Sequence, residues 1–237
     1  MSTPFLADTT TKRSIKFDRP LNGLYIPPGN QTNMALGTTF TLECWVRQDS
    51  FDVSTEHRML YQWDADGELS FLWRLYNSAG TGQVHMIVTA NGFSASQANG
   101  TQVYTARLGT WQHFASVFDA GAGSEAAKYK NYVNGVLLTA GVSTVSTATG
   151  TYAATDDIRF ADLGVGVDGN VADVRMWNDV RTANEIRDNK DVDLVGDEAG
   201  LVAYWPLRGD ALDRTANANH MILNGSPLPL FSYSTPL

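Results

Sequence analysis

The chain has 237 residues, of which 18% are charged, and its formal net charge at pH 7 is −8. Binding to a nucleic-acid backbone needs clustered Lys and Arg, and no basic run occurs here, so this composition excludes nucleic acid as a partner. The 21 glycines and the many Ser, Thr and Asn residues are typical of a β protein that is rich in turns.

Short runs of β-branched, aromatic and aliphatic residues follow one another along the chain, with turn residues between them. The clearest run is 39–47, where Phe40, Leu42, Cys44 and Val46 recur at every second position. That period is typical of a strand with one face on a core. The predicted strands, in chain order, are 14–17, 24–26, 39–47, 58–63, 69–76, 83–90, 102–108, 110–118, 128–133, 136–138, 158–167, 171–177, 202–207 and 220–223.

Two local signals stand out between these runs. Asn134-Gly135 lies between two apolar runs, and this dipeptide is the strongest short signal for a hairpin turn. Thr182 is followed three residues later by Glu185, which is the pattern of a capping box. We therefore predict one short helix, near residues 182–190.

Six blocks of sequence carry a resemblance to a known family. They are F-T-L-E-C-W-V at 40–46, W-Q-H-F-A at 111–115, Y-V-N-G at 132–135, V-A-D-V-R-M-W-N at 171–178, L-V-A-Y-W-P-L at 201–207 and N-A-N-H-M-I-L-N-G at 217–225. Together they resemble the laminin-G-like, concanavalin A-like lectin and glucanase jelly-roll family. The resemblance implies an all-β fold, a two-sheet jelly-roll sandwich with one short helix. It implies no single function, because the fold hosts lectins, enzymes and structural modules.

The chain is expected to form a single laminin-G-like domain over residues 1–237, because no linker or shift in composition divides it. The resemblance covers a core of about residues 14–225. The remaining segments, 1–13 and 226–237, are interpreted as an N-terminal and a C-terminal arm. Both arms contain apolar residues, so we expect them to pack against this domain or against neighbouring subunits.

The sequence does not favour an enzyme. Retaining glycosidases need two carboxylates about 5 Å apart, and no predicted strand carries such a pair. Residues 164–169 fit the glycine pattern of a dinucleotide site, but a strand follows them, and the helix that would hold the pyrophosphate is missing. We therefore expect a protein without catalytic residues.

Aromatic residues near the predicted turn at 64–68 are the candidates for binding carbohydrate. Trp63, Trp73, Arg74 and Tyr76 flank this turn, and flat rings with polar edges suit the apolar faces of sugars. The alternative is that the tryptophans belong to the core, since they lie in strands at alternating positions.

A structural calcium ion is the one cofactor that the family resemblance implies. Many relatives hold calcium between their N-terminal strands and the late strand, and Asp173 is the position that matches. Asp18 is the candidate partner from the N-terminal strands. The alternative is that Asp173 is a surface or salt-bridged residue of its strand. The acidic turn at 64–68 is a weaker second candidate.

The functional hypothesis combines these observations. The first residues, MSTPFLADTTTKRS, contain no apolar segment of a signal peptide, and no apolar run is long enough for a transmembrane helix. We expect synthesis in a host cytoplasm and a place on a virion surface, as a non-catalytic bacteriophage capsid decoration or tail component that adheres to cell-surface glycans. Its partners would be other virion proteins or copies of itself, bound through the arms. The alternatives are a free carbohydrate-binding lectin module and, third, a glycan hydrolase.

Overall fold

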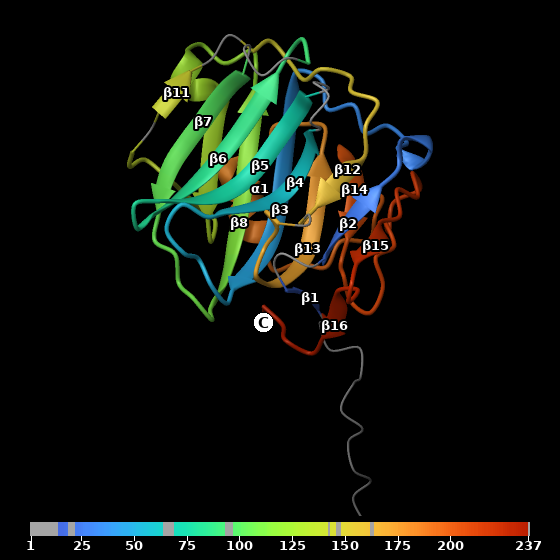
Figure 1. Ribbon diagram of the computed structural model, residues 1–237. Coiled ribbons are helices and arrows are strands. Elements are labelled where there is room, and N and C mark those ends of the chain that lie inside the picture. Colours follow the sequence, from blue (N-terminus) through green and yellow to red (C-terminus); the bar gives the residue numbers. More distant parts are fainter. Residues whose placement is uncertain are drawn as a thin grey trace, which may run out of the picture.

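The computed structural model describes residues 14–18, 22–63, 69–92, 97–141, 143–145, 148–161 and 164–236. Within these residues, two β-sheets of eight strands each pack face to face (Figure 1). Neighbouring strands in both sheets run antiparallel. The prediction of an all-β, two-sheet sandwich is therefore confirmed.

The first sheet, sheet A, holds the strands that carry most of the sequence blocks above. Its spatial order is β10 (Val136–Leu137), β9 (Tyr129–Val133), β8 (Trp111–Asp119), β3 (Thr39–Gln48), β13 (Gly169–Trp177), β1 (Ser14–Phe17) and β16 (Leu230–Ser232), and β14 (Leu201–Trp205) also pairs with β13.

The second sheet, sheet B, lies in front of sheet A in Figure 1. Its spatial order is β11 (Ser143–Val145), β7 (Gln97–Tyr104), β6 (Thr81–Thr89), β5 (Leu69–Ser78), β4 (Glu56–Trp63), β12 (Ile158–Phe160), β2 (Asn22–Ile26) and β15 (Ile222–Gly225). Short 3-10 turns lie at Pro28–Asn30 and Glu125–Lys128.

Some predicted elements differ from the structure. The strand predicted at 158–167 ends at Phe160, and β16 was not predicted at all. The C-terminal residues of the chain therefore supply an edge strand of sheet A, paired with β1. Residues 1–13 lie outside the described residues, and the division into a core and two arms stays a prediction.

The core lies between the two sheets and is built from the inward-facing residues of both. Phe40, Leu42, Cys44 and Val46 of β3 are all buried in it, as the period of two predicts. Aromatic rings meet there at short range, with 5.3 Å between the centroids of Phe40 and Phe118. Burial of such large side chains is the main source of stability in a sandwich of this size.

The outer face of sheet A is covered by α1 (Ala183–Asn189), where Ile186 packs on Ala115, Val117 and Tyr132. The predicted capping box is present. The amide of Glu185 donates to the Thr182 hydroxyl at 3.3 Å, and the Glu185 carboxylate accepts from the Thr182 amide at 2.7 Å. In the described part of the chain this is the single α-helix, so the outer face of sheet B carries no helix.

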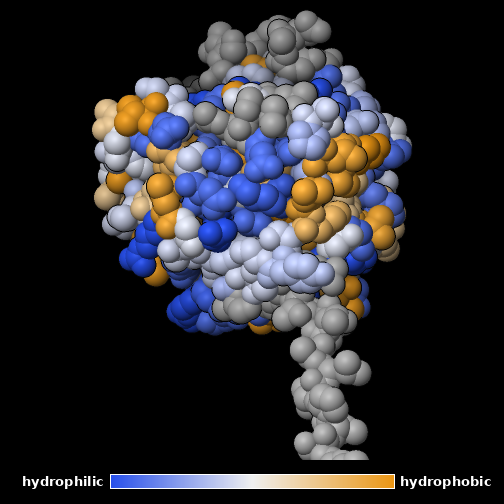
Figure 2. Space-filling model, turned by 60° about the horizontal axis from the view of Figure 1, so that its bottom comes forward, coloured by the Kyte–Doolittle hydropathy of each residue, from blue (hydrophilic) through white to orange (hydrophobic). Residues whose placement is uncertain are grey.

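The surface mixes polar and apolar areas. In the view of Figure 2, hydrophilic residues gather in the middle of the molecule and hydrophobic residues lie to the right of them. Large apolar side chains are exposed in the C-terminal segment, where Leu228 is 51%, Leu230 68% and Tyr233 79% exposed. None of the described helices has the length and apolar character needed to cross a membrane.

Candidate functional site

The outer face of sheet B is the candidate site. Alternation along β5 sends Phe71, Trp73 and Leu75 into the core, so that Arg74 and Tyr76 lie on the outer face. The neighbouring strand β6 places His85 directly beside Arg74, and Gln83 beside Tyr76. Polar and aromatic side chains from adjacent strands are thus brought together although they are distant in sequence.

One half of this face is apolar. Tyr61, Leu72 and Ile87, from three adjacent strands, form a cluster against which Trp63 packs. The guanidinium of Arg58 lies over the Tyr61 ring, 5.3 Å from its centroid, which is the geometry of a cation–π contact.

The other half of the face is charged and centres on Glu56. Arg58 donates to one carboxylate oxygen of Glu56 at 2.9 Å, and Arg74 donates to the other. Arg58 and Arg74 are cross-strand partners in the register of β4 and β5. Like charges in that position repel each other, and the carboxylate between them offsets the repulsion. We call Glu56, Arg58, Arg74 and His85 the arginine cluster.

The hydrogen bonds of His85 fix its protonation state. Its Nδ1 accepts from Arg74 at 3.2 Å, and its Nε2 lies 2.8 Å from the Gln83 side-chain oxygen, so the ring carries its proton on Nε2. Burial and, second, the nearby Arg74 lower the pKa of His85 to about 4. The imidazole is therefore neutral at pH 7 and does not add to the charge of the arginine cluster.

A hollow of about 470 Å³ opens beside this cluster. Its lining residues are Ser54, Thr55, Glu56, Arg74, Tyr76, Gly164 and Val165. Its volume lies within the range of roughly 300–1,000 Å³ that is usual for small-molecule sites. The lining offers hydroxyl groups, a carboxylate, a guanidinium and an aromatic ring, which together can bind the hydroxyl groups and the apolar face of a sugar.

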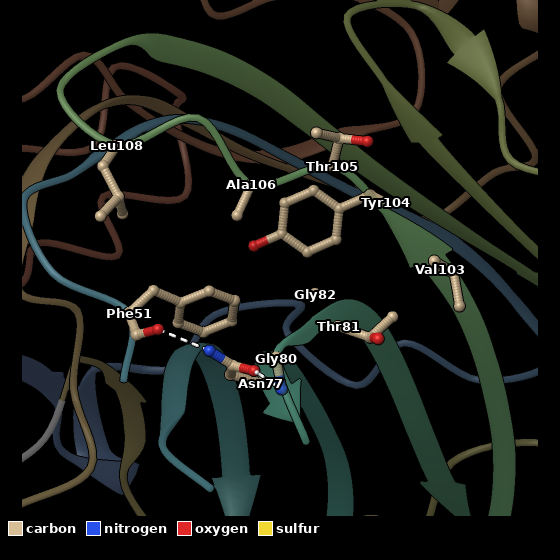
Figure 3. A pocket seen from close by; sticks show the side chains of 10 residues that line it. All are labelled: Phe51, Asn77, Gly80, Thr81, Gly82, Val103, Tyr104, Thr105, Ala106 and Leu108. Carbon is tan, nitrogen blue, oxygen red and sulfur yellow. Dashed lines mark hydrogen bonds between the residues drawn. The ribbon is translucent and has the colours of Figure 1, made fainter. Parts of the chain in front are cut away.

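A second hollow, of about 450 Å³, lies between the β5–β6 turn and the segment that follows β7 (Figure 3). Asn77 donates to the Phe51 carbonyl and accepts from the Gly80 amide at 2.9 Å, as the dashed lines of Figure 3 show. The Tyr104 hydroxyl donates to Gln48 at 3.0 Å. These polar groups are bonded within the protein, and Tyr104 is only 4% exposed. This hollow therefore offers a ligand fewer polar and aromatic contacts than the hollow beside the arginine cluster.

The structure separates the four residues predicted to bind carbohydrate. Trp73 is wholly buried in the core, so its prediction as a sugar-facing residue is wrong. It neighbours Arg74 in a strand, and adjacent residues of a strand face opposite sides. Trp63 shares the outer face with Arg74 and Tyr76, but it pairs with Leu69, seven residues along β5 from Tyr76, or about 23 Å.

Arg74 and Tyr76 are therefore the two predicted residues that the structure brings together, with Arg74 5.3 Å from the centroid of the Tyr76 ring. Glu56, Arg58 and His85 were not among the residues predicted from the sequence. The signal that could have found them is the same alternation, since each lies at an outward position of β4 or β6.

The two residues predicted to hold calcium lie apart. Phe17 pairs with Gly169 in antiparallel register, so Asp18 lies opposite the residue before β13. That position is five residues from Asp173, or about 16 Å along an extended strand. Asp173 is buried and accepts from the Tyr204 hydroxyl at 2.8 Å and from Arg208 at 3.2 Å. Asp173 is therefore a salt-bridged residue of its strand, as the alternative interpretation states. Asp18 and Asp173 therefore do not fit one shared calcium site.

No group of three or more metal-ligating side chains occurs among the residues that the structure describes. The acidic turn at 64–68 lies outside those residues. Calcium binding by this chain stays a prediction.

The chain matches one protein family over most of its length. The family model Laminin_G_3, described as the concanavalin A-like lectin/glucanases superfamily, matches residues 22–187, which is more than half of the chain. The chain therefore belongs to this superfamily, and the resemblance seen in its sequence blocks is confirmed. No curated protein matches the chain.

Two solved structures illustrate the likeness in fold. A protein from Bacteroides ovatus, proposed to bind carbohydrate, has a TM-score of 0.65 and 16% identity; the match covers 94% of this chain but only 60% of that one. The heptameric SAP-like pentraxin from Limulus polyphemus has a TM-score of 0.63 and 14% identity, with 96% and 97% of the two chains covered. At these identities the likeness shows the fold alone.

Proposed function

We propose that this protein is a non-catalytic carbohydrate-binding protein whose ligand lies on the outer face of sheet B. The observation that carries the proposal is the hollow beside the arginine cluster, where hydroxyl groups, an aromatic ring and charged groups line one cavity. The superfamily and the proposed role of the Bacteroides ovatus protein support the same ligand class.

The carboxylates of this face support a binding role rather than hydrolysis. In the described part of the face they are Glu56 and Asp157, and each accepts hydrogen bonds from arginine. A glycosidase needs one carboxyl group that donates a proton and a second that attacks or activates water. Both oxygens of the Glu56 carboxylate accept from Arg58 and Arg74, and Asp157 accepts from Arg159, so both carboxylates hold arginines in place, which favours a binding role.

Binding to a panel of soluble polysaccharides and oligosaccharides, measured by titration calorimetry with the purified protein, tests this proposal. Tyr76→Ala should weaken binding about tenfold, which is about 1.4 kcal/mol, because it removes the ring that borders the hollow. Tyr233→Ala is the matched control, since Tyr233 is exposed in the C-terminal segment. Binding to no carbohydrate, or equal losses in the two variants, would contradict the proposal.

A narrower proposal concerns where the protein acts, namely on the surface of a virion as a capsid decoration or tail component. The exposed apolar side chains of Leu228, Leu230 and Tyr233 support it, because such exposure is typical of a surface that contacts another protein. The test is whether Leu228→Ser and Leu230→Ser reduce incorporation into particles while carbohydrate binding is retained. Normal incorporation of both variants would favour the alternative, a free carbohydrate-binding module.

A further inference from the structure

The arginine cluster carries more positive than negative charge. Its two guanidinium groups share the single carboxylate of Glu56, and His85 is neutral at pH 7. One positive charge is therefore left uncompensated within the cluster. This excess is local, since the whole chain has a net charge of −8.

Both arginines keep hydrogen-bond donors available. Each guanidinium has five N–H groups. In the part of the chain that the structure describes, Arg74 uses Nε, Nη1 and Nη2 once each, and Arg58 uses Nε and Nη2. Both side chains are 23% exposed, so the remaining donors can meet a ligand from solvent.

The partners of the arginines hold them in place. Glu56 is fixed between both guanidinium groups, and the tautomer of His85 keeps Nδ1 as an acceptor toward Arg74. Tyr76 lies on a third side of Arg74. A pre-ordered guanidinium loses little conformational entropy when an anion binds, and its planar fork matches two oxygens of one anionic group.

We propose that the arginine cluster binds the single negative charge of an acidic sugar, a uronate carboxylate or a sulfate ester, while the adjacent hollow holds the sugar ring. The inference rests on the proposed function and names the class of carbohydrate. Arg58 and Arg74 contact the anionic group, and Tyr76 with the hydroxyl groups of Ser54 and Thr55 borders the ring. Neutral sugars satisfy the hydroxyl contacts but leave the excess charge without a partner.

The experiment compares acidic oligosaccharides with neutral forms of the same skeleton. Trimers of galacturonate, glucuronate and mannuronate are each paired with their methyl esters, and a sulfated galactose trimer is paired with the unsulfated one. Affinities are measured by titration calorimetry at pH 7. At least one acidic trimer should bind tenfold or more tightly than its neutral form, and the uronate and sulfate pairs separate the two sources of charge.

Three variants locate the effect. Arg74→Gln and Arg58→Gln should each reduce the preference for the acidic form to within about threefold. Arg159→Gln is the matched control, since it removes an arginine of the same face that is paired with Asp157 instead, and it should keep the preference. Circular dichroism checks the fold of each variant. The comparison of acidic with neutral trimers is made in the wild-type protein, so the inference is tested even if a variant does not fold.

The outcomes are distinct. Equal binding of acidic and neutral trimers, or an equal loss of preference in Arg159→Gln, overturns the inference and leaves the carbohydrate-binding proposal standing. If the protein binds none of the trimers and no polysaccharide, this inference and the carbohydrate-binding proposal are both overturned.

Discussion

Lys16 is the cation at the centre of three carboxylates. Its ammonium group lies 2.9 Å from Asp49, 3.4 Å from Asp18 and 3.5 Å from Asp168. Burial lowers the pKa of Lys16, but the hydrogen bond to Asp49 and the surrounding negative charges together raise it above its ordinary value of 10.5. A raised pKa stabilises the fold fully below 10.5, and this contribution is lost as the pH rises through the raised value.

Lys16→Met should lower the free energy of unfolding by about 1 kcal/mol at low salt, because the aspartates then repel one another. The loss should shrink in about 1 M NaCl, where the charges are screened within a few ångströms. Urea denaturation at both salt concentrations measures this, with Lys130→Met as the control. A loss that is the same at both concentrations would show that the cluster does not act through charge.

The lowered pKa of His85 makes the stability of the fold depend on pH. Its pKa is lowered to about 4 in the folded protein, so the unfolded chain binds more protons between pH 6.5 and 4. The free energy of unfolding should therefore fall, by up to about 3 kcal/mol, as the pH falls through this window. His85→Gln should remove this part of the slope in urea denaturation curves, and an unchanged slope would assign it to other groups.

At the scale of elements, β7 of sheet B and β9 of sheet A lie so close together that one position of β7 requires glycine. A Cβ atom on Gly100 of β7 would lie 2.3 Å from the Cβ atom of Tyr129 of β9. The two sheets can approach here because the side chain is missing. The Tyr129 ring then packs on Phe118, with 5.2 Å between the ring centroids.

Gly100→Ala should lower the free energy of unfolding by about 1–3 kcal/mol, because Tyr129 must shift within a packed core. Gly123→Ala is the matched control, since nothing lies within 4 Å of its added Cβ atom. Thermal unfolding of both variants checks this. A variant at Gly100 as stable as the control would mean that the sheets can separate locally without cost.

The strands and the helix cap that were predicted correctly depend on local patterns. The buried face of β3 follows from its own alternation, and the helix start from Thr182 and Glu185. β16 was missed because three residues become a strand only by pairing with β1, more than 200 residues away. Such pairing is set by tertiary contacts rather than by propensity.

The site was predictable only in part, for a related reason. Both faces of β5 carry apolar residues, so the sequence alone left its inward face ambiguous, and Trp73 was assigned to the wrong one. A shift of one residue exchanges the two faces of a strand. The arginine cluster depends on the register that sets Arg58 opposite Arg74, which no local pattern specifies.

At the scale of the whole molecule, the C-terminal strand closes one edge of sheet A. Removal of residues 226–237 would expose the backbone of β1 along the edge that now pairs with β16. Exposed strand edges pair with other chains. The truncated protein should unfold at lower urea concentration and form oligomers on size-exclusion chromatography. Removal of residues 235–237 alone, which follow β16 in the chain, is the control. This shorter truncation should elute from the column in the same oligomeric state as the intact chain.

The pairing of β1 with β16 also determines how the molecule would respond to a mechanical load. Ser14 lies opposite Ser232, and its hydroxyl donates to the Ser234 carbonyl at 2.7 Å, so the two ends of the described chain leave the sandwich at one corner. Tension between these ends would act across the strand pair and peel its hydrogen bonds apart one after another, instead of loading all of them together in shear. β16 would therefore detach first and at low force, while the sandwich behind it stays folded.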